Sequence, residues 1–175
     1  MKLKRIAIVL SLAGCVYPGR ATREERMAIA SDERTRFCAG DIEPAVEKVL
    51  GQVKAVWPLY VKLRTGPRNS YAQKLVGAQL EVAAGQAMTA EELQRLLRCH
   101  QARRALGEVA PAETDPFSLA DSWIDIQVRS ERQGLIVSLR GQTAEESQLI
   151  DSKAEALIAA KGACEQPPSI CSLQE

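Results

Sequence analysis

The residues of this chain best suited to chemistry are the neighbours Cys99 and His100. A thiol beside an imidazole can act as a nucleophile with its base, bind a metal or hold a haem. Successive side chains on a helix point about 100° apart, so these two cannot serve as nucleophile and base for each other. Covalent haem attachment expects C-x-x-C-H, but Leu96 stands where the first cysteine belongs. We therefore expect His100 to be a packed histidine beside a disulfide cysteine.

An enzymatic role of His100 is an alternative hypothesis. Histidine is a common general acid or base, and Asp115, Asp121 and Asp125 follow it closely enough in the sequence to lie near it in space. The sequence contains no other recognisable catalytic set, neither a nucleophile triad nor a phosphate-binding loop. We therefore expect that the chain is not an enzyme and holds no cofactor.

Arginines surround His100 on the same predicted helix, at positions Arg95, Arg98, Arg103 and Arg104. Charges spaced in this way are usually solvated helix surface, which is the role that we expect. Arg103 and Arg104 also flank the leucine stripe in which His100 lies. The three residues His100, Arg103 and Arg104 therefore form an alternative docking site for an anionic group.

Another cysteine, Cys15, has a different setting. It ends the sequence Leu12-Ala13-Gly14-Cys15, which follows three basic residues and an apolar core over residues 6–13. A membrane-spanning helix needs about 20 residues, so this short core is typical of an export signal. The arrangement resembles a bacterial lipoprotein signal peptide with its lipobox.

The resemblance implies that residues 1–14 are removed and that Cys15 carries diacylglycerol and an N-acyl chain. Each buried methylene contributes about 0.8 kcal/mol, so several acyl chains hold a protein on a membrane. Lipoproteins retained in the inner membrane often carry aspartate after the lipidated cysteine, whereas this chain has Val16. The resemblance therefore implies the outer membrane, with the chain facing the periplasm. An ordinary secretory signal with a chance cysteine is the alternative.

Lipidation of one of the five cysteines leaves an even number, which favours disulfides in an oxidising compartment. The four disulfide candidates are Cys38, Cys99, Cys164 and Cys171. We favour a bridge that ties the tail containing Cys164 and Cys171 back to the domain. The alternative is a local bridge between Cys164 and Cys171, with Cys38 and Cys99 joined or free. We expect no metal site, because a C-x-x-C pair is missing and the chain has one histidine.

The composition argues against a nucleic-acid partner. The chain has 175 residues, with 23 Lys and Arg against 22 Asp and Glu, so bulk attraction to polyanions is not indicated. Aromatic residues make up 4% of the chain, too few for a stacking platform for bases or sugars. We expect a protein partner in the cell envelope and contact with the membrane through the lipid.

The mature length fits one domain. Residues 15–40 are polar and read as a lipidated N-terminus and tether, which becomes helical around residues 22–37. Residues 41–162 contain the periodic segments and form the predicted α/β domain. Residues 163–175 contain cysteine and proline and form the predicted tail.

Hydrophobic periodicity predicts the elements of this domain. Asp41 is the N-cap of a first helix that Pro58 ends, and apolar residues then alternate over residues 59–63. The further strands and helices are predicted at residues 75–83, 89–106, 123–128 and 135–139, and after Thr143.

Two stretches repeat the same order of elements. Leu80-Glu81-Val82 precedes T-A-E-E-L-Q at Thr89, and a second apolar strand precedes T-A-E-E-S-Q at Thr143. Duplication and convergence on a good helix start explain the repeat equally well. The order α-ββα-ββα predicts an α+β fold, a two-layer α/β sandwich with a four-stranded sheet and helices on one face. The other face, or an edge of the sheet, is then the natural docking surface.

Two resemblances concern the domain itself. The pattern Gly77-Ala78, then Leu93-Gln94-Arg95, then Cys99-His100 resembles uncharacterised bacterial lipoproteins, which implies no activity. The run V-S-L-R-G at residues 137–141, followed by a helix, is similar to the strand and helix of BON domains, which are small periplasmic modules linked to membrane association.

These observations lead to one main hypothesis and two alternatives. We expect a lipid-anchored envelope lipoprotein that acts as a non-catalytic interaction or structural module in the periplasm. The alternatives are a BON-like module that associates with membranes and an envelope enzyme that uses His100.

Overall fold

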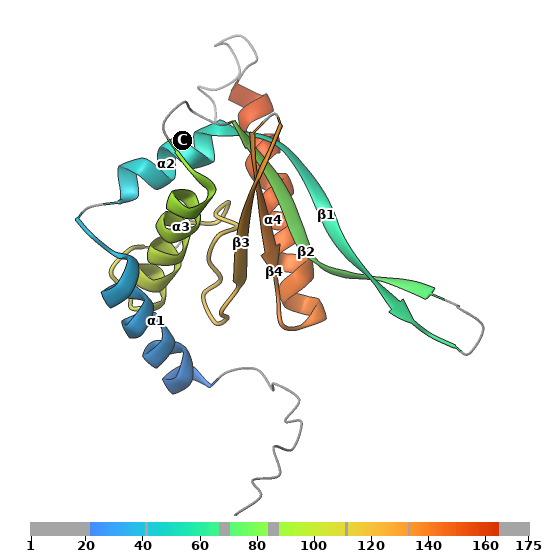
Figure 1. Ribbon diagram of the computed structural model, residues 1–175, viewed down its shortest axis with the longest axis horizontal. Coiled ribbons are helices and arrows are strands. Elements are labelled where there is room, and N and C mark those ends of the chain that lie inside the picture. The colour runs from blue at the N-terminus through green and yellow to red at the C-terminus, as the bar shows by residue number, and fades with distance from the viewer. Residues whose placement is uncertain are drawn as a thin grey trace, which may run out of the picture.

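The computed structural model describes residues 22–40, 42–66, 71–83, 88–110, 112–132 and 134–164. Their elements are α1 (Arg23–Phe37), α2 (Glu43–Gln52), β1 (Val53–Arg64), β2 (Tyr71–Ala83), α3 (Ala90–Ala105), β3 (Asp125–Glu131), β4 (Gly134–Arg140) and α4 (Ala144–Cys164). The strands form an antiparallel sheet in the order β1-β2-β4-β3 (Figure 1). The predicted α+β class and the order α-ββα-ββα are confirmed, with α1 as a further helix at the front.

One hydrophobic core joins the sheet to the helices on one face. Alternate residues of β4 and β2 point into it, and so do apolar residues of α3 and α4, because strand side chains alternate between the two faces. The buried residues that show this arrangement are Leu80, Val82, Leu93, Leu97, Val137, Leu139, Ile150 and Leu157. Since both helices contribute to the same cluster, they cover the same face, and no helix of the described ranges is packed in the core on the other face.

The repeated T-A-E-E segments begin α3 and α4 in the same way. The Thr89 hydroxyl accepts from the Glu92 amide at 3.2 Å, and the Thr143 hydroxyl accepts from the Glu146 amide at 3.2 Å. Each glutamate in turn accepts from the amide of its threonine, which makes two capping boxes. The strands that precede the two helices are β2 and β4, and they pair with each other at the centre of the sheet.

The first predicted helix ends earlier than its periodicity indicates. α2 stops at Gln52, and Val53 begins β1, which continues through Pro58 to Arg64. Val53 and Val56 reach the core from a strand as well as they would from a helix, so the spacing did not distinguish the two. Pro58 is tolerated because β1 is an edge strand, where a missing N–H does not interrupt a central ladder. Asp41 lies outside the described residues.

The hairpin of β1 and β2 extends beyond the sheet. β2 pairs with β4 only from Gly77 to Ala83, whereas its pairing with β1 continues to Arg64 and Tyr71. We call residues 59–64 and 71–76 the arm, which projects from the body in Figure 1. Gly77 stands where the arm begins, with φ +148°, and a Cβ there would overlap the carbonyl oxygen of Leu139. Only glycine fits this close approach of two strands without strain.

The segment that the sequence assigned to a tether forms α1 and packs on α3. Ala30 and Glu33 are buried in that contact, and the Glu33 carboxylate pairs with the Arg98 guanidinium of α3. Because polar side chains make much of this interface, α1 has no strong apolar stripe to predict its docking. The folded body therefore includes residues 22–38.

Candidate functional site

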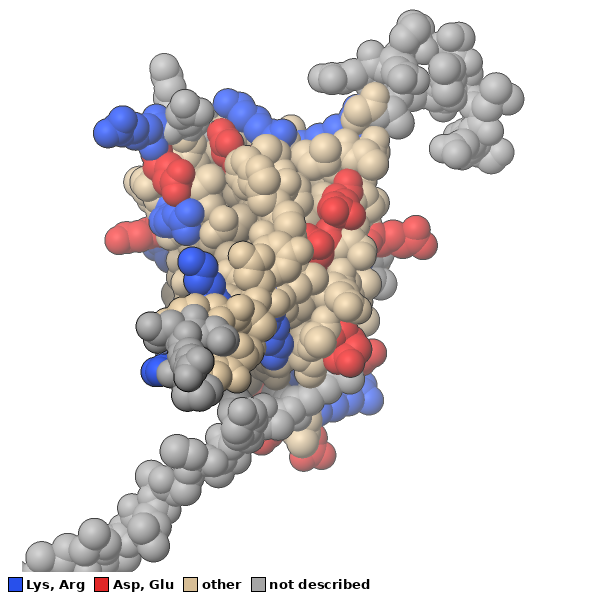
Figure 2. Space-filling model, turned by 90° about the vertical axis from the view of Figure 1, so that its right-hand side faces the viewer, with Lys and Arg blue, Asp and Glu red and all other residues tan. Residues whose placement is uncertain are grey.

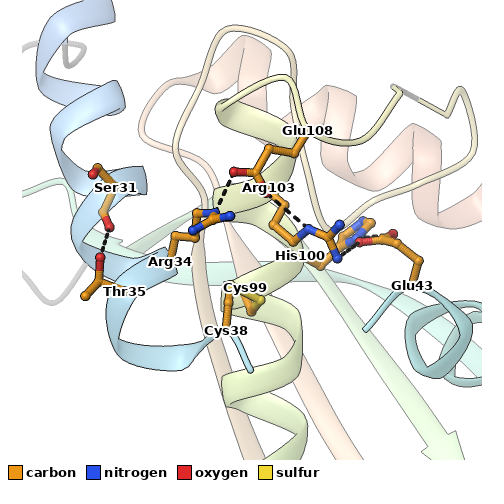
Figure 3. Close-up of a disulfide and its surroundings, with 9 residues drawn as sticks. All are labelled: Ser31, Arg34, Thr35, Cys38, Glu43, Cys99, His100, Arg103 and Glu108. Carbon is orange, nitrogen blue, oxygen red and sulfur yellow. Dashed lines mark hydrogen bonds and ion pairs between the residues drawn. A yellow bond between two sulfur atoms is a disulfide. The ribbon is translucent and has the colours of Figure 1, made fainter. Parts of the chain in front are cut away.

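His100 lies at the centre of a buried polar network. Its ring is 1% exposed, in the leucine stripe of α3. Nδ1 lies 3.1 Å from Glu43 Oε2 at the start of α2, and Nε2 lies 2.9 Å from Asp115 Oδ2 in the segment between α3 and β3. Figure 3 shows the His100 ring beside Glu43, next to the Cys38–Cys99 bridge. The prediction of a packed histidine with satisfied ring nitrogens is confirmed.

Asp115 is the most enclosed carboxylate of this network. It accepts hydrogen bonds from the Phe117 amide at 2.9 Å and the Ser118 hydroxyl at 2.8 Å, and it pairs with Arg104 Nε at 3.0 Å. Burial by itself raises the pKa of Asp115, but the hydrogen bond and charge of His100, with the hydroxyl and amide donors, hold its pKa below the ordinary value. The group is therefore an ionised, fully hydrogen-bonded carboxylate at neutral pH.

The predicted docking arginines are already engaged within the chain. Arg103 lies 3.5 Å from Glu43 and 3.4 Å from Glu108, and Arg104 binds both Asp115 and the carbonyl oxygen of Ala110. Figure 3 shows Arg103 and Arg34 converging on Glu108. An anion that used His100, Arg103 and Arg104 would have to displace these carboxylates.

Two further arginines of α3 differ from each other. The Arg98 guanidinium carbon lies 4.7 Å from the centre of the Phe37 ring, and Arg98 pairs with Glu33. Arg98 therefore helps to hold α1 in place, although its side chain is 35% exposed. Arg95 is exposed, as expected for helix surface.

The geometry around His100 suits a structural clamp. The network joins α2, α3 and the segment before β3 through side chains that are all partnered. Asp121 and Asp125 lie away from it, since Asp121 pairs with Arg26 at 3.8 Å and Asp125 accepts from Gln127 at 3.1 Å. Within the described ranges, no group of three His, Cys, Asp or Glu residues is arranged to hold a metal ion.

The disulfide joins Cys38, just after α1, to Cys99 of α3, with 5.2 Å between the Cα atoms and a sequence separation of 61. The favoured bridge from the tail to the domain is wrong, because Cys38 and Cys99 bind each other. The joined pair is the one that the alternative allowed. Cys15 and Cys171 lie outside the described residues, as does the side chain of Cys164.

The face of the sheet without helices carries an open hollow of 680 Å³. Trp57, Glu81, Arg129, Arg132 and Ile136 are among its lining residues, contributed by all four strands and the turn after β3. Trp57 is 45% exposed there. The residues that line this hollow include both polar and apolar side chains.

The two edges of the sheet differ. At β3, Gln94 Oε1 of α3 accepts from the Val128 amide at 3.1 Å, and Gln101 Nε2 donates to the Ile124 carbonyl at 3.2 Å. At β1, no further strand of the described residues continues the sheet, along the full length of the arm. Figure 2, which faces this side, shows a broad area of uncharged residues with acidic and basic residues around it.

The sequence predicts a docking surface at an edge of the sheet but does not predict the arm. Trp57, Tyr60, Leu63 and Tyr71 are large and exposed. The alternation over residues 59–63 predicts a half-buried strand instead. The available signal was charge, because the segment from residue 59 to 76 contains lysine and arginine but no acidic residue.

Comparisons with known proteins found no match to a family model, to a curated protein or to a solved structure.

Proposed function

We propose that this chain is a lipid-anchored lipoprotein of the bacterial envelope, whose folded body is a non-catalytic interaction module at the periplasmic face of the outer membrane. The observation that carries the proposal is the sequence Leu12-Ala13-Gly14-Cys15 after a basic start and a short apolar core. Among the described residues, no helix has the length and hydropathy to cross a membrane. In this proposal the acyl chains on Cys15 supply the attachment.

The disulfide supports export from the cytoplasm. Cys38 and Cys99 join two helices of the folded body, and such bridges persist in oxidising compartments. Since these two cysteines bind each other, neither competes for Cys15 in the folded protein.

The arrangement of polar groups supports an interaction role. The strongest cluster of titratable groups is buried and satisfied, whereas the uncovered sheet face and the arm display exposed apolar and charged side chains. A module that binds another macromolecule needs such a surface, and it needs no reactive group.

Metabolic labelling with palmitate tests the anchor. The wild-type chain should incorporate label, and Cys15→Ala should abolish it, because no thiol remains for the lipid. Cys171→Ala is the matched control and should label normally. Unlabelled wild-type protein, or equal labelling of Cys15→Ala, would refute lipidation at this position.

Val16→Asp tests the membrane assignment. The variant should move from the outer-membrane fraction to the inner-membrane fraction, because aspartate at this position marks retained lipoproteins. Wild-type protein that fractionates with the inner membrane would contradict the outer-membrane part of the proposal and leave lipidation to be judged from the palmitate result.

A further inference from the structure

The outer edge of β1 pairs with no other strand of the described residues, and β1 displays exposed aromatic and aliphatic side chains beside its basic ones. β1 has 12 residues, and an edge strand presents a row of unpaired backbone groups to any other strand. Trp57 and Leu63 are each 45% exposed and Tyr60 is 50% exposed on this strand. The β3 edge is covered by glutamine side chains, so the two edges are not equally open.

A copy of the same strand complements this edge. An antiparallel pair of identical strands about a twofold axis centred on Tyr60 sets Trp57 opposite Leu63 and Leu59 opposite Val61. These pairs are apolar on both sides, and cross-strand pairs of this kind stabilise sheets. In the same register Lys62 faces Pro58 and Arg64 faces Val56, so no like charges meet. Each Pro58 contributes a carbonyl but no N–H to this ladder.

The arm and α4 carry opposite charges that lack partners of opposite charge among the described residues. Lys62 and Arg64 have no carboxylate partner among the described residues. On α4, Asp151 Oδ1 is buried with no hydrogen-bond partner in that same set, and Glu155 lies one turn away. Burial and the charge of Glu155 raise the pKa of Asp151, as expected of a carboxylate that lacks a cation.

These acidic residues lie on the flank of α4 that faces β1. The opposite flank contains Lys153, which donates to the carbonyl oxygens of Ala112 and Glu113. Farther along α4, Lys161 donates to the carbonyl oxygen of Val53 at 2.7 Å, where β1 begins. On an α-helix, residues two positions from Lys153 project about 160° away from it. Asp151 and Glu155 therefore lie beside β1, at the level that the arm of a second copy would reach.

We infer that two copies of this chain associate through their β1 edges, so that the sheet continues from one copy into the other. In this dimer Lys62 and Arg64 of each arm bind Asp151 and Glu155 on α4 of the other copy. The interaction surface of the proposed module is thus, at this edge, a self-association surface. The inference goes beyond the proposed function and does not depend on the lipid at Cys15.

A charge-swap experiment tests the dimer in the full-length chain. Two copies with different affinity tags are co-expressed, and co-purification is measured after membrane solubilisation. An arm variant (Lys62→Glu with Arg64→Glu) and a helix variant (Asp151→Lys with Glu155→Lys) are each paired with themselves and with each other. Like charges across an interface cost several kcal/mol, so each variant paired with itself should lose about tenfold or more of the wild-type signal.

The mixed pair is decisive. An arm variant with a helix variant restores opposite charges at both arm–helix contacts, so co-purification should return to the wild-type level. The control carries Lys48→Glu with Arg95→Glu, two exposed residues on α2 and α3, and should co-purify as wild type does. Thermal melting of each variant confirms that the fold persists.

A photo-crosslinker fixes the geometry. Placed at Leu63 it should yield an adduct of twice the chain mass, and placed at exposed Gln127 on β3 it should not. Wild-type copies that do not co-purify, or a mixed pair that stays dissociated while both variants fold, would overturn the inference. Loss of binding to vesicles of anionic phospholipid in the arm variant, with wild type remaining monomeric, would overturn it in favour of a membrane surface.

Discussion

The helical layer, formed by α1, α2 and α3, and the β1 edge differ in how their charged side chains are paired. Around His100, two carboxylates and two arginines lie within hydrogen-bonding or ion-pair distance of one another and are largely removed from water. On the arm, Lys62 and Arg64 stand in solvent without a carboxylate partner in the described chain. A buried charge needs a partner of opposite charge or hydrogen bonds within the fold, whereas an exposed charge is stabilised by water and remains free to bind another molecule.

The difference indicates where stability and function lie. Substitutions in the helical layer should act on folding, because they leave buried groups without partners. Substitutions on the arm should act on association and leave the fold intact.

Asp115→Ala should have the largest effect. Removing one partner of a buried ion pair typically costs about 3 to 5 kcal/mol, since His100 and Arg104 would lose their carboxylate. Denaturant unfolding measures the loss. The control is Asp121→Ala, whose side chain is 79% exposed and should change stability by about 0.5 kcal/mol or less. Equal decreases in the free energy of unfolding of the two variants would show that the effect of removing a carboxylate does not depend on its burial.

The disulfide should rank second. Replacing Cys38 and Cys99 together by serine should lower the free energy of unfolding by about 2 to 4 kcal/mol, because the unfolded chain loses a long covalent loop. A reducing agent should lower the free energy of unfolding of the wild type by the same amount, and it should not change that of the variant. A variant as stable as the wild type would show that the contacts between α1 and α3 hold this layer alone.

Acid should remove part of the stability that Asp115 provides. The pKa of Asp115 is lower in the folded protein than its ordinary value of 3.8, so the folded state prefers the ionised form. The resulting stability is fully present above pH 3.8 and is lost as the pH falls through the folded pKa. Unfolding curves of the wild type and Asp115→Asn from pH 7 to pH 3 should converge toward low pH. Parallel curves would contradict the role of this carboxylate.

The sequence predicted the elements better than it predicted their contacts. The capping boxes at Thr89 and Thr143 are local, so the starts of α3 and α4 could be found from four residues each. The partners of His100 are Glu43, 57 positions before it, and Asp115, 15 positions after it. Nothing in the sequence distinguishes Glu43 from the other glutamates at such a distance.

The same limit applies to α1 and the arm. Polar contacts dock α1, so no hydrophobic period marked its interface. Apolar and polar residues alternate in the arm as they do in an ordinary half-buried strand, and only the sheet order shows that no other strand of the described part of the chain pairs with its edge. An edge that is open because no further strand pairs with it cannot be recognised from the local pattern of apolar and polar residues.

Substitutions on the arm should have the smallest effect on folding. Lys62→Ala and Tyr71→Ala each remove an exposed side chain, and surface changes of this kind alter the free energy of unfolding by about 0.5 kcal/mol or less. The measurement must be made on dilute protein, because dissociated copies report the fold of one chain and associated copies also report the interface. At high concentration the same Lys62→Ala change should lower the melting temperature relative to wild type. A large loss at low concentration would instead make the arm part of the folding core and would remove the division between the two regions.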